Sequence, residues 1–335
     1  MRMTVLGAYG PYPAAGGACS GYLLQHEDCS VLIDCGNGVL SRLQQFIELS
    51  ELEAIIVSHL HSDHISDLFI LRYALLFAME RGEIKRPLPL FAPVEPAEEY
   101  RRLPYKNVYA MEELVEGHDL QLGPFTFSFL KTKHSIPCYA MAVYLAGEKK
   151  LVYSADTEHF SFLSDFARGA ELFLCEANYL EEDLQKGAGN HLTARQAASI
   201  AHEAGVGTLL LTHLLPFRNQ QAYLAEAGQV FNNVEIAKEG MCYDLNSPAP
   251  GDPAKDSPVK WQELTVVTDA VTASILAGRL EEEGIPVFLR KDEAAGSIYG
   301  LTTGPLANIR VLVPPAKIQQ AQDLLKEIEK GLEWN

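Results

Sequence analysis

The stretch HLHSDH at residues 59–64 follows the apolar run Ala54-Ile55-Ile56-Val57 after a single serine, Ser58. A short apolar run bounded by polar residues is typical of a buried strand. Four of the next six side chains are imidazoles or a carboxylate: His59, His61, Asp63 and His64. These groups are ligands that suit zinc and similar first-row ions. The sequence therefore predicts a strand that ends at a metal site.

The spacing within this stretch restricts its backbone. On a helix, the rings of His59 and His61 would point about 200° apart, so extended or loop backbone is expected there. Asp63 and His64 then require the chain to turn into a helix, which Ser62 and Asp63 favour. One metal ion needs three or four ligands, so a site for two ions would need more ligands from later strand ends.

Three further residues stand at such places. His134 follows the strand-like segment 125–131, Asp156 follows 151–155, and His213 follows 208–212. Taken singly, each could equally be a capping or core-edge residue. Together, short strands that alternate with helical segments and end in polar residues predict a layered α/β or αββα domain. Its site should lie along one edge of the sheets.

HLHSDH, followed by a single His, Asp and His at successive strand ends, resembles the metallo-β-lactamase superfamily of metallohydrolases. The resemblance covers about residues 1–244 and fills all seven ligand positions. It implies an αββα sandwich with two divalent ions at one edge, most simply Zn²⁺, with Mn²⁺ or iron as alternatives. The implied ligands are His59, His61 and His134 for one ion, Asp63, His64 and His213 for the other, and Asp156 as the bridge.

Two such cations lower the pKa of a shared water and give a bridging hydroxide near neutral pH. They also neutralise charge on a phosphoryl or carbonyl oxygen in the transition state. We therefore expect a binuclear metal-dependent hydrolase. Asp63 is predicted to be a catalytic residue as well as a ligand, so its replacement by alanine should abolish turnover.

Two further stretches resemble the ribonuclease Z-like and phosphodiesterase branch of that superfamily, namely CEAN at 175–178 and HLTARQA at 191–197. His191 lies just ahead of a predicted helix N-terminus, a favourable place for an anion. It could protonate a leaving oxygen, with Glu176 as its orienting partner or as a second acid. The alternative is that His191 only caps the helix and Glu176 only ends a strand.

The substrate expected from the sequence is a small phosphodiester, such as a cyclic or short nucleotide. The tRNA-processing members of the branch carry a long arm after the position of His134, whereas here only 22 positions separate His134 from Asp156. The net charge of −17 also argues against a broad grip on nucleic-acid phosphates, so structured tRNA is not expected. A lactone, thioester or β-lactam hydrolase fits the seven ligands too. A ligand-sensing protein is the alternative from another class.

A second module is predicted at the C-terminus. Residues 246–261 are Pro-rich and polar, as in a linker, and separate a hydrolase domain at 1–245 from a small α+β domain at 262–335. The pattern of that domain is β-α-β-loop-β-α. It resembles small bacterial domains described as signal-transducing modules of ferredoxin-like, PII-related type. The loop at 294–301 would bind a ligand or a partner, or belong to a module that forms a homodimer.

The bulk composition fits an ordinary globular protein. The chain has 335 residues, of which 47% are hydrophobic and 21% charged. No apolar run reaches the roughly 20 residues that span a bilayer, and no signal peptide is apparent, so a cytoplasmic location is expected. The six cysteines form no CxxC pair and are expected to be buried thiols. Four histidines are read as structural or surface residues: His26, His118, His159 and His202.

Overall fold

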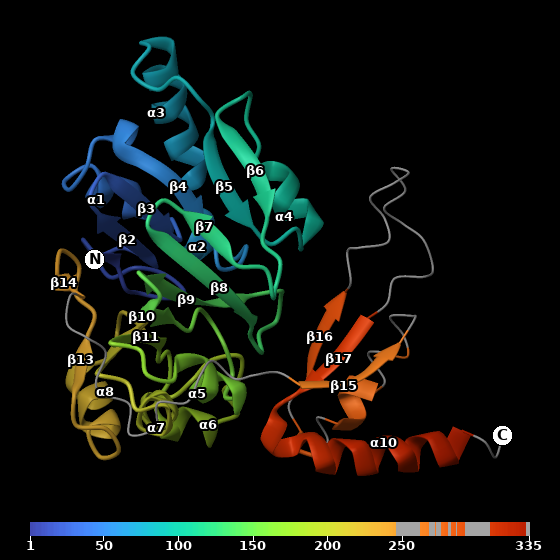
Figure 1. Cartoon of the computed structure of the whole chain (residues 1–335). Coiled ribbons are helices and arrows are strands. Elements are labelled where there is room, and N and C mark those ends of the chain that lie inside the picture. The colour runs from blue at the N-terminus through green and yellow to red at the C-terminus, as the bar shows by residue number, and fades with distance from the viewer. Residues whose placement is uncertain are drawn as a thin grey trace, which may run out of the picture. The chain divides into compact units, whose positions relative to one another are not determined.

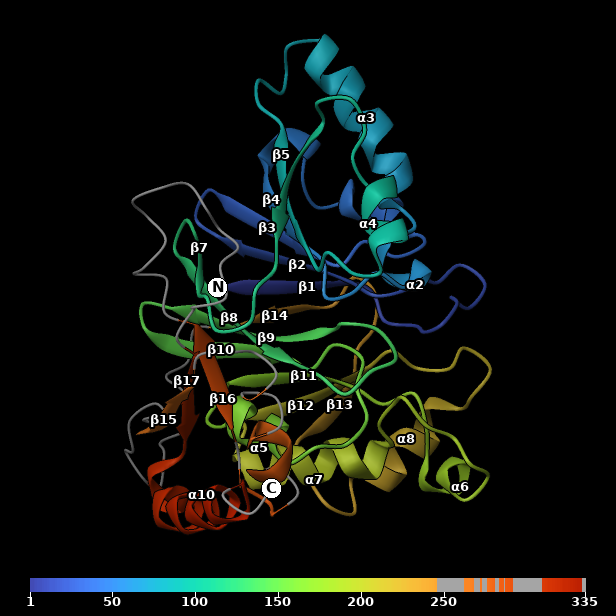
Figure 2. The same cartoon turned by 90° about the vertical axis from the view of Figure 1, so that its right-hand side faces the viewer.

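The structure is a computed structural model that describes residues 1–245, 262–267, 272, 276–280, 283–285, 287–291 and 309–332. The chain divides into two compact units, Met1–Asp252 and Pro253–Asn335. The predicted linker at 246–261 lies outside the described residues. Figures 1 and 2 show the helices and strands of both units.

Two seven-stranded sheets form the N-terminal unit. The first has the order β14-β1-β2-β3-β4-β5-β6 and the second β13-β12-β11-β10-β9-β8-β7. The strands of the first sheet are β1 (Arg2–Gly7), β2 (Gly21–His26), β3 (Cys29–Ile33), β4 (Leu52–Ile56), β5 (Leu88–Ala92), β6 (Tyr109–Glu113) and β14 (Cys242–Asp244). Those of the second are β7 (Leu120–Leu122), β8 (Phe125–Lys131), β9 (Tyr139–Leu145), β10 (Glu148–Tyr153), β11 (Leu172–Glu176), β12 (Thr208–Thr212) and β13 (Val234–Ile236).

The alternation of side chains along the strands builds the layers. In β8, Phe125, Phe127 and Phe129 all point into the core between the two sheets, because every second residue of a strand faces the same side. In β4, Ile56 joins that core, whereas Ile55 packs into a second core under the helices. A strand that is buried on both faces reads as a continuous apolar run, which is what the sequence shows before HLHSDH.

Helices cover the outer face of each sheet. α1 (Val39–Leu43) and α3 (Leu68–Glu80) pack on the first sheet, and α5 (Phe162–Ala167), α7 (Ala194–Ala204) and α8 (Gln220–Ala227) pack on the second. The remaining helical segments of this unit are η1 (Leu49–Glu51), α2 (Ser62–Ile65), α4 (Ala97–Arg102) and α6 (Glu181–Leu184). The predicted αββα sandwich is therefore confirmed (Figure 1).

Parallel pairing brings the polar strand ends together. β10, β11 and β12 are paired in parallel, with Tyr153 opposite Leu174 and Leu174 opposite Leu210. β3 and β4 are likewise parallel. Because the carboxyl ends of parallel strands meet at one edge of a sheet, the residues that follow β10, β11 and β12 lie at the same edge. This is the position predicted for the site.

One expectation from the sequence needs correction. Five cysteines are buried as expected, but Cys242, on the edge strand β14, is exposed. Thr193 and Gln196 form a capping box at the start of α7, because the Thr193 hydroxyl accepts from the Gln196 amide and the Gln196 side chain accepts from the Thr193 amide.

The C-terminal unit contains a three-stranded antiparallel sheet of order β15-β17-β16. Its described elements are β15 (Gln262–Val267), β16 (Phe288–Lys291), β17 (Ile309–Val313), η3 (Pro315–Lys317) and α10 (Ile318–Leu332), and residues 276–280 are helical. The order of elements is thus the predicted one. The loop at 294–301 lies outside the described residues. Within the described part of the chain, no helix combines the length and apolarity needed to cross a membrane.

Candidate metal centre

The histidine stretch takes the backbone that its spacing requires. Residues 57–61 leave β4 as a loop, and the predicted turn into a helix occurs as α2. The N-cap of α2 is His61 rather than Ser62, and the His64 amide donates to the His61 carbonyl at 3.0 Å. This turn brings the side chains of Asp63 and His64 to the same edge as His59.

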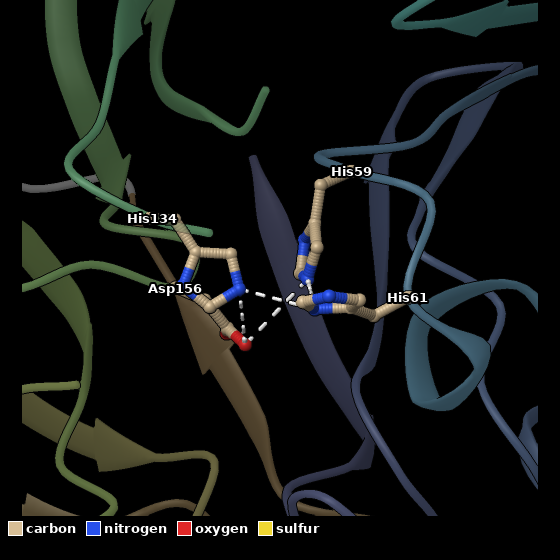
Figure 3. Close-up of side chains that lie close together, drawn as sticks. All are labelled: His59, His61, His134 and Asp156. Carbon is tan, nitrogen blue, oxygen red and sulfur yellow. Dashed lines mark hydrogen bonds and ion pairs between the residues drawn. The ribbon is translucent and has the colours of Figure 1, made fainter. Parts of the chain in front are cut away.

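One cluster joins the two sheets (Figure 3). His61 Nδ1 lies 3.0 Å from His59 Nε2 and 3.0 Å from His134 Nε2. Asp156 Oδ2 lies 3.6 Å from His59 Nε2 and 3.9 Å from His134 Nε2. Four ligands held at about 2.0–2.1 Å by a tetrahedral ion would lie about 3.3–3.4 Å apart. The observed separations are close to that spacing.

A second cluster adjoins the first and shares Asp156. Asp63 Oδ2 is 3.0 Å from His213 Nε2 and 3.7 Å from His64 Nε2. Asp156 Oδ1 lies 3.5 Å from His64 Nε2, and Asp156 Oδ2 lies 3.3 Å from His213 Nε2. The structure thus brings together all seven residues that the sequence singled out as metal ligands, with Asp156 between the two groups.

Two buried atoms indicate what the clusters would hold. His64 Nε2 and Asp156 Oδ1 are inaccessible to solvent and have no hydrogen-bond partner among the residues that the structure describes. A buried polar atom without a partner costs roughly 1–3 kcal/mol. A cation between these two atoms would satisfy both, and a set of imidazoles and carboxylates suits divalent first-row ions. The residues present therefore fit the divalent metal binding that the fold implies.

The electrostatics of the cluster prepare it for cations. Burial lowers the pKa values of His59, His61 and His134, so these rings are neutral, which is the form that binds a metal. Burial would also lower the pKa of His64, but the carboxylates of Asp156 and Asp63 and a third one, Asp34, raise it well above its ordinary value. The same carboxylates would attract a cation to this position.

Asp34, which the sequence reading missed, holds His64 in position. Its Oδ2 accepts from His64 Nδ1 at 2.8 Å, from Tyr153 Oη at 3.0 Å and from Ser58 Oγ at 2.9 Å. Its Oδ1 accepts from the Ser58 amide at 2.7 Å. Because Nδ1 of His64 is engaged here, Nε2 points into the site. The available signal was an acidic residue directly after the apolar strand β3, the same pattern that identified Asp156.

Glu176 and His191 lie beside this centre. Glu176 is fully buried; its Oε1 accepts from His191 Nδ1 at 2.9 Å and from the Thr157 amide at 2.8 Å. Its Oε2 accepts from the amides of Asn178 and Leu192, both at 3.2 Å. All four contacts are with other groups of the protein, so both carboxylate oxygens of Glu176 are occupied. This arrangement favours the orienting role for Glu176 over that of a second acid.

The ring of His191 is accessible from solvent, with 17% of the side chain exposed. Its Nδ1 lies 3.9 Å from Asp156 Oδ2, and the ring stacks on His213 with centroids 5.2 Å apart. Burial would lower the pKa of His191, but the Glu176 carboxylate outweighs it and raises that pKa to about 9. His191 is thus an imidazole with a raised pKa that Glu176 holds at the edge of the candidate metal centre.

His213 is fixed by neighbours that the sequence reading did not single out. The Asn178 side-chain amide donates to the carbonyl oxygens of His213 at 2.8 Å and of Gly10 at 3.2 Å. The backbone of Gly10 lies flat against the imidazole, since a Cβ built there would be 2.0 Å from His213 Nε2. Only glycine leaves room for the ring at this position.

Gly10→Ala is therefore expected to displace the His213 ring and to weaken metal binding at the second cluster. Overpacking of this kind typically costs about 1–3 kcal/mol. Titration of the metal-free protein with Zn²⁺ in a calorimeter should show one weakened phase. Gly16→Ala is the matched control, because a Cβ at Gly16 meets no atom within 4 Å. Although Gly16 has a positive φ of 74°, any strain there lies away from the ligands. Unchanged titration of Gly10→Ala would contradict the role assigned to this contact.

Comparison with known proteins places these features in a family. The sequence profile described as "Beta-lactamase superfamily domain" matches residues 30–214. A second profile, described as "Putative prokaryotic signal transducing protein", matches residues 261–329. The two matches fall on the two modules that the sequence predicts.

Individual relatives agree with these matches. The "Probable metallo-hydrolase YhfI" of Bacillus subtilis strain 168 is 38% identical over 245 residues, which cover 73% of this chain and 100% of YhfI. The crystal structure of YhfI, a metallo-β-lactamase fold protein, covers 72% of this chain and 98% of its own at a TM-score of 0.69.

More distant relatives include ribonucleases of this fold. Ribonuclease Z of Brevibacillus brevis strain 47 is 28% identical over 272 residues, which cover 62% of this chain and 85% of the ribonuclease. The crystal structure of the short form of human tRNase Z has 21% identity and a TM-score of 0.60, and covers 74% of this chain and 100% of its own. The latter similarity concerns the fold alone.

Proposed function

Because this chain belongs to the β-lactamase superfamily and is a metallo-hydrolase by kinship with YhfI, we propose that it is a phosphodiesterase. Its substrates would be small phosphodiesters, such as cyclic or short nucleotides. The observation that carries the proposal is the Glu176–His191 pair beside the two ligand clusters. Support also comes from kinship with Brevibacillus brevis ribonuclease Z, since a ribonuclease by its name acts on phosphodiester bonds.

Two divalent ions, Zn²⁺ being the best match to the ligands, would supply positive charge against the phosphoryl oxygens and lower the pKa of an attacking water. The first cluster, with His59, His61 and His134, and the second, with Asp63, His64 and His213, would hold one ion each. Asp156 faces both clusters and would bridge them. Without an ion, Asp63 Oδ2 lies 3.0 Å from His213 Nε2 and holds that ring in the cluster.

His191 would act on the leaving group. When a phosphodiester is cleaved, the departing alkoxide needs a proton, and a positioned imidazole can donate it. Nδ1 of His191 is committed to Glu176, so the ring cannot turn away from its place beside Asp156 and His213. Glu176, which is closed off from solvent, would position His191 without touching the substrate.

The segment between His134 and Asp156 supports a small substrate. β9 and β10, joined by a tight turn at Ala146 and Gly147, occupy nearly all of it. No RNA-gripping arm can be accommodated there. Together with the acidic chain, this favours small esters over structured tRNA.

His191→Gln is expected to slow cleavage of a 3′,5′-cyclic nucleotide by roughly 10²–10⁴-fold in kcat, because its alkoxide leaving group depends on the acid. Turnover of bis(p-nitrophenyl) phosphate should change little, since p-nitrophenolate leaves without protonation. Steady-state kinetics on the metal-loaded protein measure both values. His202→Gln, on the outer helix α7, is the matched control.

The alternatives make different predictions. If the wild type cleaves lactones or thioesters but neither phosphodiester, the protein is an acyl hydrolase and the proposal fails. Equal losses on both phosphodiesters in His191→Gln would instead assign His191 a role in binding.

The C-terminal unit gives a second candidate role. Its profile match is to a family described as signal transducing, and the YhfI relative is covered completely by a match to only 73% of this chain. We propose that the unit binds a ligand or a second copy of the chain and regulates the hydrolase. Activity and its dependence on protein concentration, compared with and without residues 246–335, would test this.

A further inference from the structure

Two loops meet over His213 at the edge of the candidate metal centre. The first follows β1 and the second follows β12. The Leu214 amide donates to the Ala8 carbonyl at 2.9 Å, and the Gly10 amide donates to the Leu214 carbonyl at 3.2 Å. Figure 2 shows the chain after β1 and the chain after β12 at the same edge of the two sheets. They therefore form one rim beside the second ligand cluster.

Each loop presents an aromatic ring to solvent. Tyr12 is 51% exposed and Phe217 is 71% exposed. Tyr12 lies two residues beyond Gly10, whose backbone touches the His213 ring, and Phe217 lies four residues beyond His213. At no more than about 3.6 Å per residue, the Cα atom of Tyr12 lies within about 7 Å of the Cα atom of Gly10. The Cα atom of Phe217 likewise lies within about 14 Å of the Cα atom of His213. Both residues therefore lie on the backbone that borders the second ligand cluster.

The first loop is held in place on both sides of Tyr12. The Arg42 guanidinium donates to the Gly16 carbonyl, and the Ala18 amide donates to Glu239 Oε1 at 3.1 Å. The Gly17 amide donates to the Ala14 carbonyl at 2.8 Å. Tyr12 is therefore exposed on an anchored backbone, which limits the conformational entropy lost when a ligand stacks on it.

The second loop is also anchored. Arg218, next to Phe217, pairs with Asp183 at 2.9 Å and with Glu182 at 3.3 Å. The Leu215 amide donates to the Tyr223 hydroxyl at 3.3 Å. Since the charge of Arg218 is turned away to these carboxylates, Phe217 is what the loop offers to a ligand. A single exposed aromatic residue is ordinary, whereas here two lie on anchored loops that are joined beside one candidate ligand.

We propose that Tyr12 and Phe217 bind a planar heterocycle and so make nucleoside-bearing phosphodiesters the preferred substrates. This inference rests on the phosphodiesterase proposed above and adds the residues that would select its nucleotide substrates. Aromatic rings stack on any nucleobase, because every base has a π face. Phosphodiesters without a base, such as those of glycerol or a simple alcohol, would find no partner on this rim.

The test compares two esters that release the same p-nitrophenolate, adenosine 5′-(p-nitrophenyl) phosphate and methyl p-nitrophenyl phosphate. Phe217→Ala should lower kcat/KM for the adenosine ester by roughly 5–100-fold and leave the methyl ester unchanged. Tyr12→Ala should act in the same direction, and Phe217→Trp should restore the wild-type preference. Phe77→Ala is the matched control, because Phe77 on α3 is 57% exposed and lies outside both loops.

Binding gives a second readout that does not depend on turnover. Calorimetry of AMP with the full chain should show a Kd that Phe217→Ala raises by a similar factor. Equal effects on the two esters, or no effect on either, would overturn the inference. If the wild type cleaves neither ester, the proposed phosphodiesterase falls. AMP binding then decides this inference alone, and absent or unaltered binding overturns it.

Discussion

Asp156→Ala is expected to abolish hydrolysis and to lower the metal content of the purified protein. The two carboxylate oxygens of Asp156 face both ligand clusters, so its removal weakens both at once. We expect a fall in kcat/KM of roughly 10³-fold or more, because the charge that stabilises the transition state is lost with the metal. Elemental analysis and turnover of bis(p-nitrophenyl) phosphate measure the two effects.

The control for this prediction is Asp28→Ala, in the exposed turn between β2 and β3. It removes the same group and should keep wild-type metal content and activity. Thermal unfolding of Asp156→Ala should still show a cooperative transition, which separates a lost site from a lost fold. Full metal occupancy in an active Asp156→Ala protein would refute the bridging assignment.

Asp34→Ala is expected to destabilise the N-terminal unit strongly. The carboxylate is fully buried and accepts four hydrogen bonds, from the Ser58 amide and hydroxyl, His64 and Tyr153. Alanine would leave these donors without a partner, at a cost of about 3–5 kcal/mol in the free energy of unfolding. Freed from Asp34, His64 should also lose its fixed orientation, and metal affinity should fall by roughly 10–100-fold.

Two further variants separate the contributions of single groups to this loss of stability. Tyr153→Phe removes one of the four donors and should cost about 1.5–3 kcal/mol, because the lost bond is to a charged group. Asp34→Asn keeps the shape and tolerates the positive φ of 56° at this position, but it turns an amide toward a donor. Urea unfolding with the metal removed gives the stability, and Zn²⁺ titration gives the affinity. If Asp34→Ala has the same free energy of unfolding as the wild type, the stabilising role assigned to the Asp34 hydrogen bonds is wrong.

The sequence singled out the seven residues that the structure brings together because they stand where strands stop. An apolar run followed by His or Asp marks both the strand and its edge, so His134, Asp156 and His213 could be placed without knowing the pairing of the strands. The αββα layers followed from the same alternation of elements. Short edge strands such as β13 and β14 were missed because three residues carry too little periodicity to stand out.

Supporting residues were harder to find because their role depends on contacts across the fold. Asp34 and His64 are 30 positions apart, and no local pattern links them. Asn178 reaches His213 across 35 positions in the same way. Glycine is required at position 10 because the ring of His213, the residue after β12, packs against it. This contact is visible only in the tertiary structure. The burial of Glu176, which also depends on the whole fold, favours its role as the orienting partner of His191 over that of a second acid.

The division of the ligands between the two sheets has a mechanical consequence. His59, His61, Asp63 and His64 follow a strand of the first sheet, whereas His134, Asp156 and His213 follow strands of the second. A cation bound among them would connect the two sheets of the sandwich. Because the ligands come together only in the folded chain, its binding free energy would add to the free energy of unfolding. The concentration of available metal would thus affect the stability of the folded chain as well as its activity.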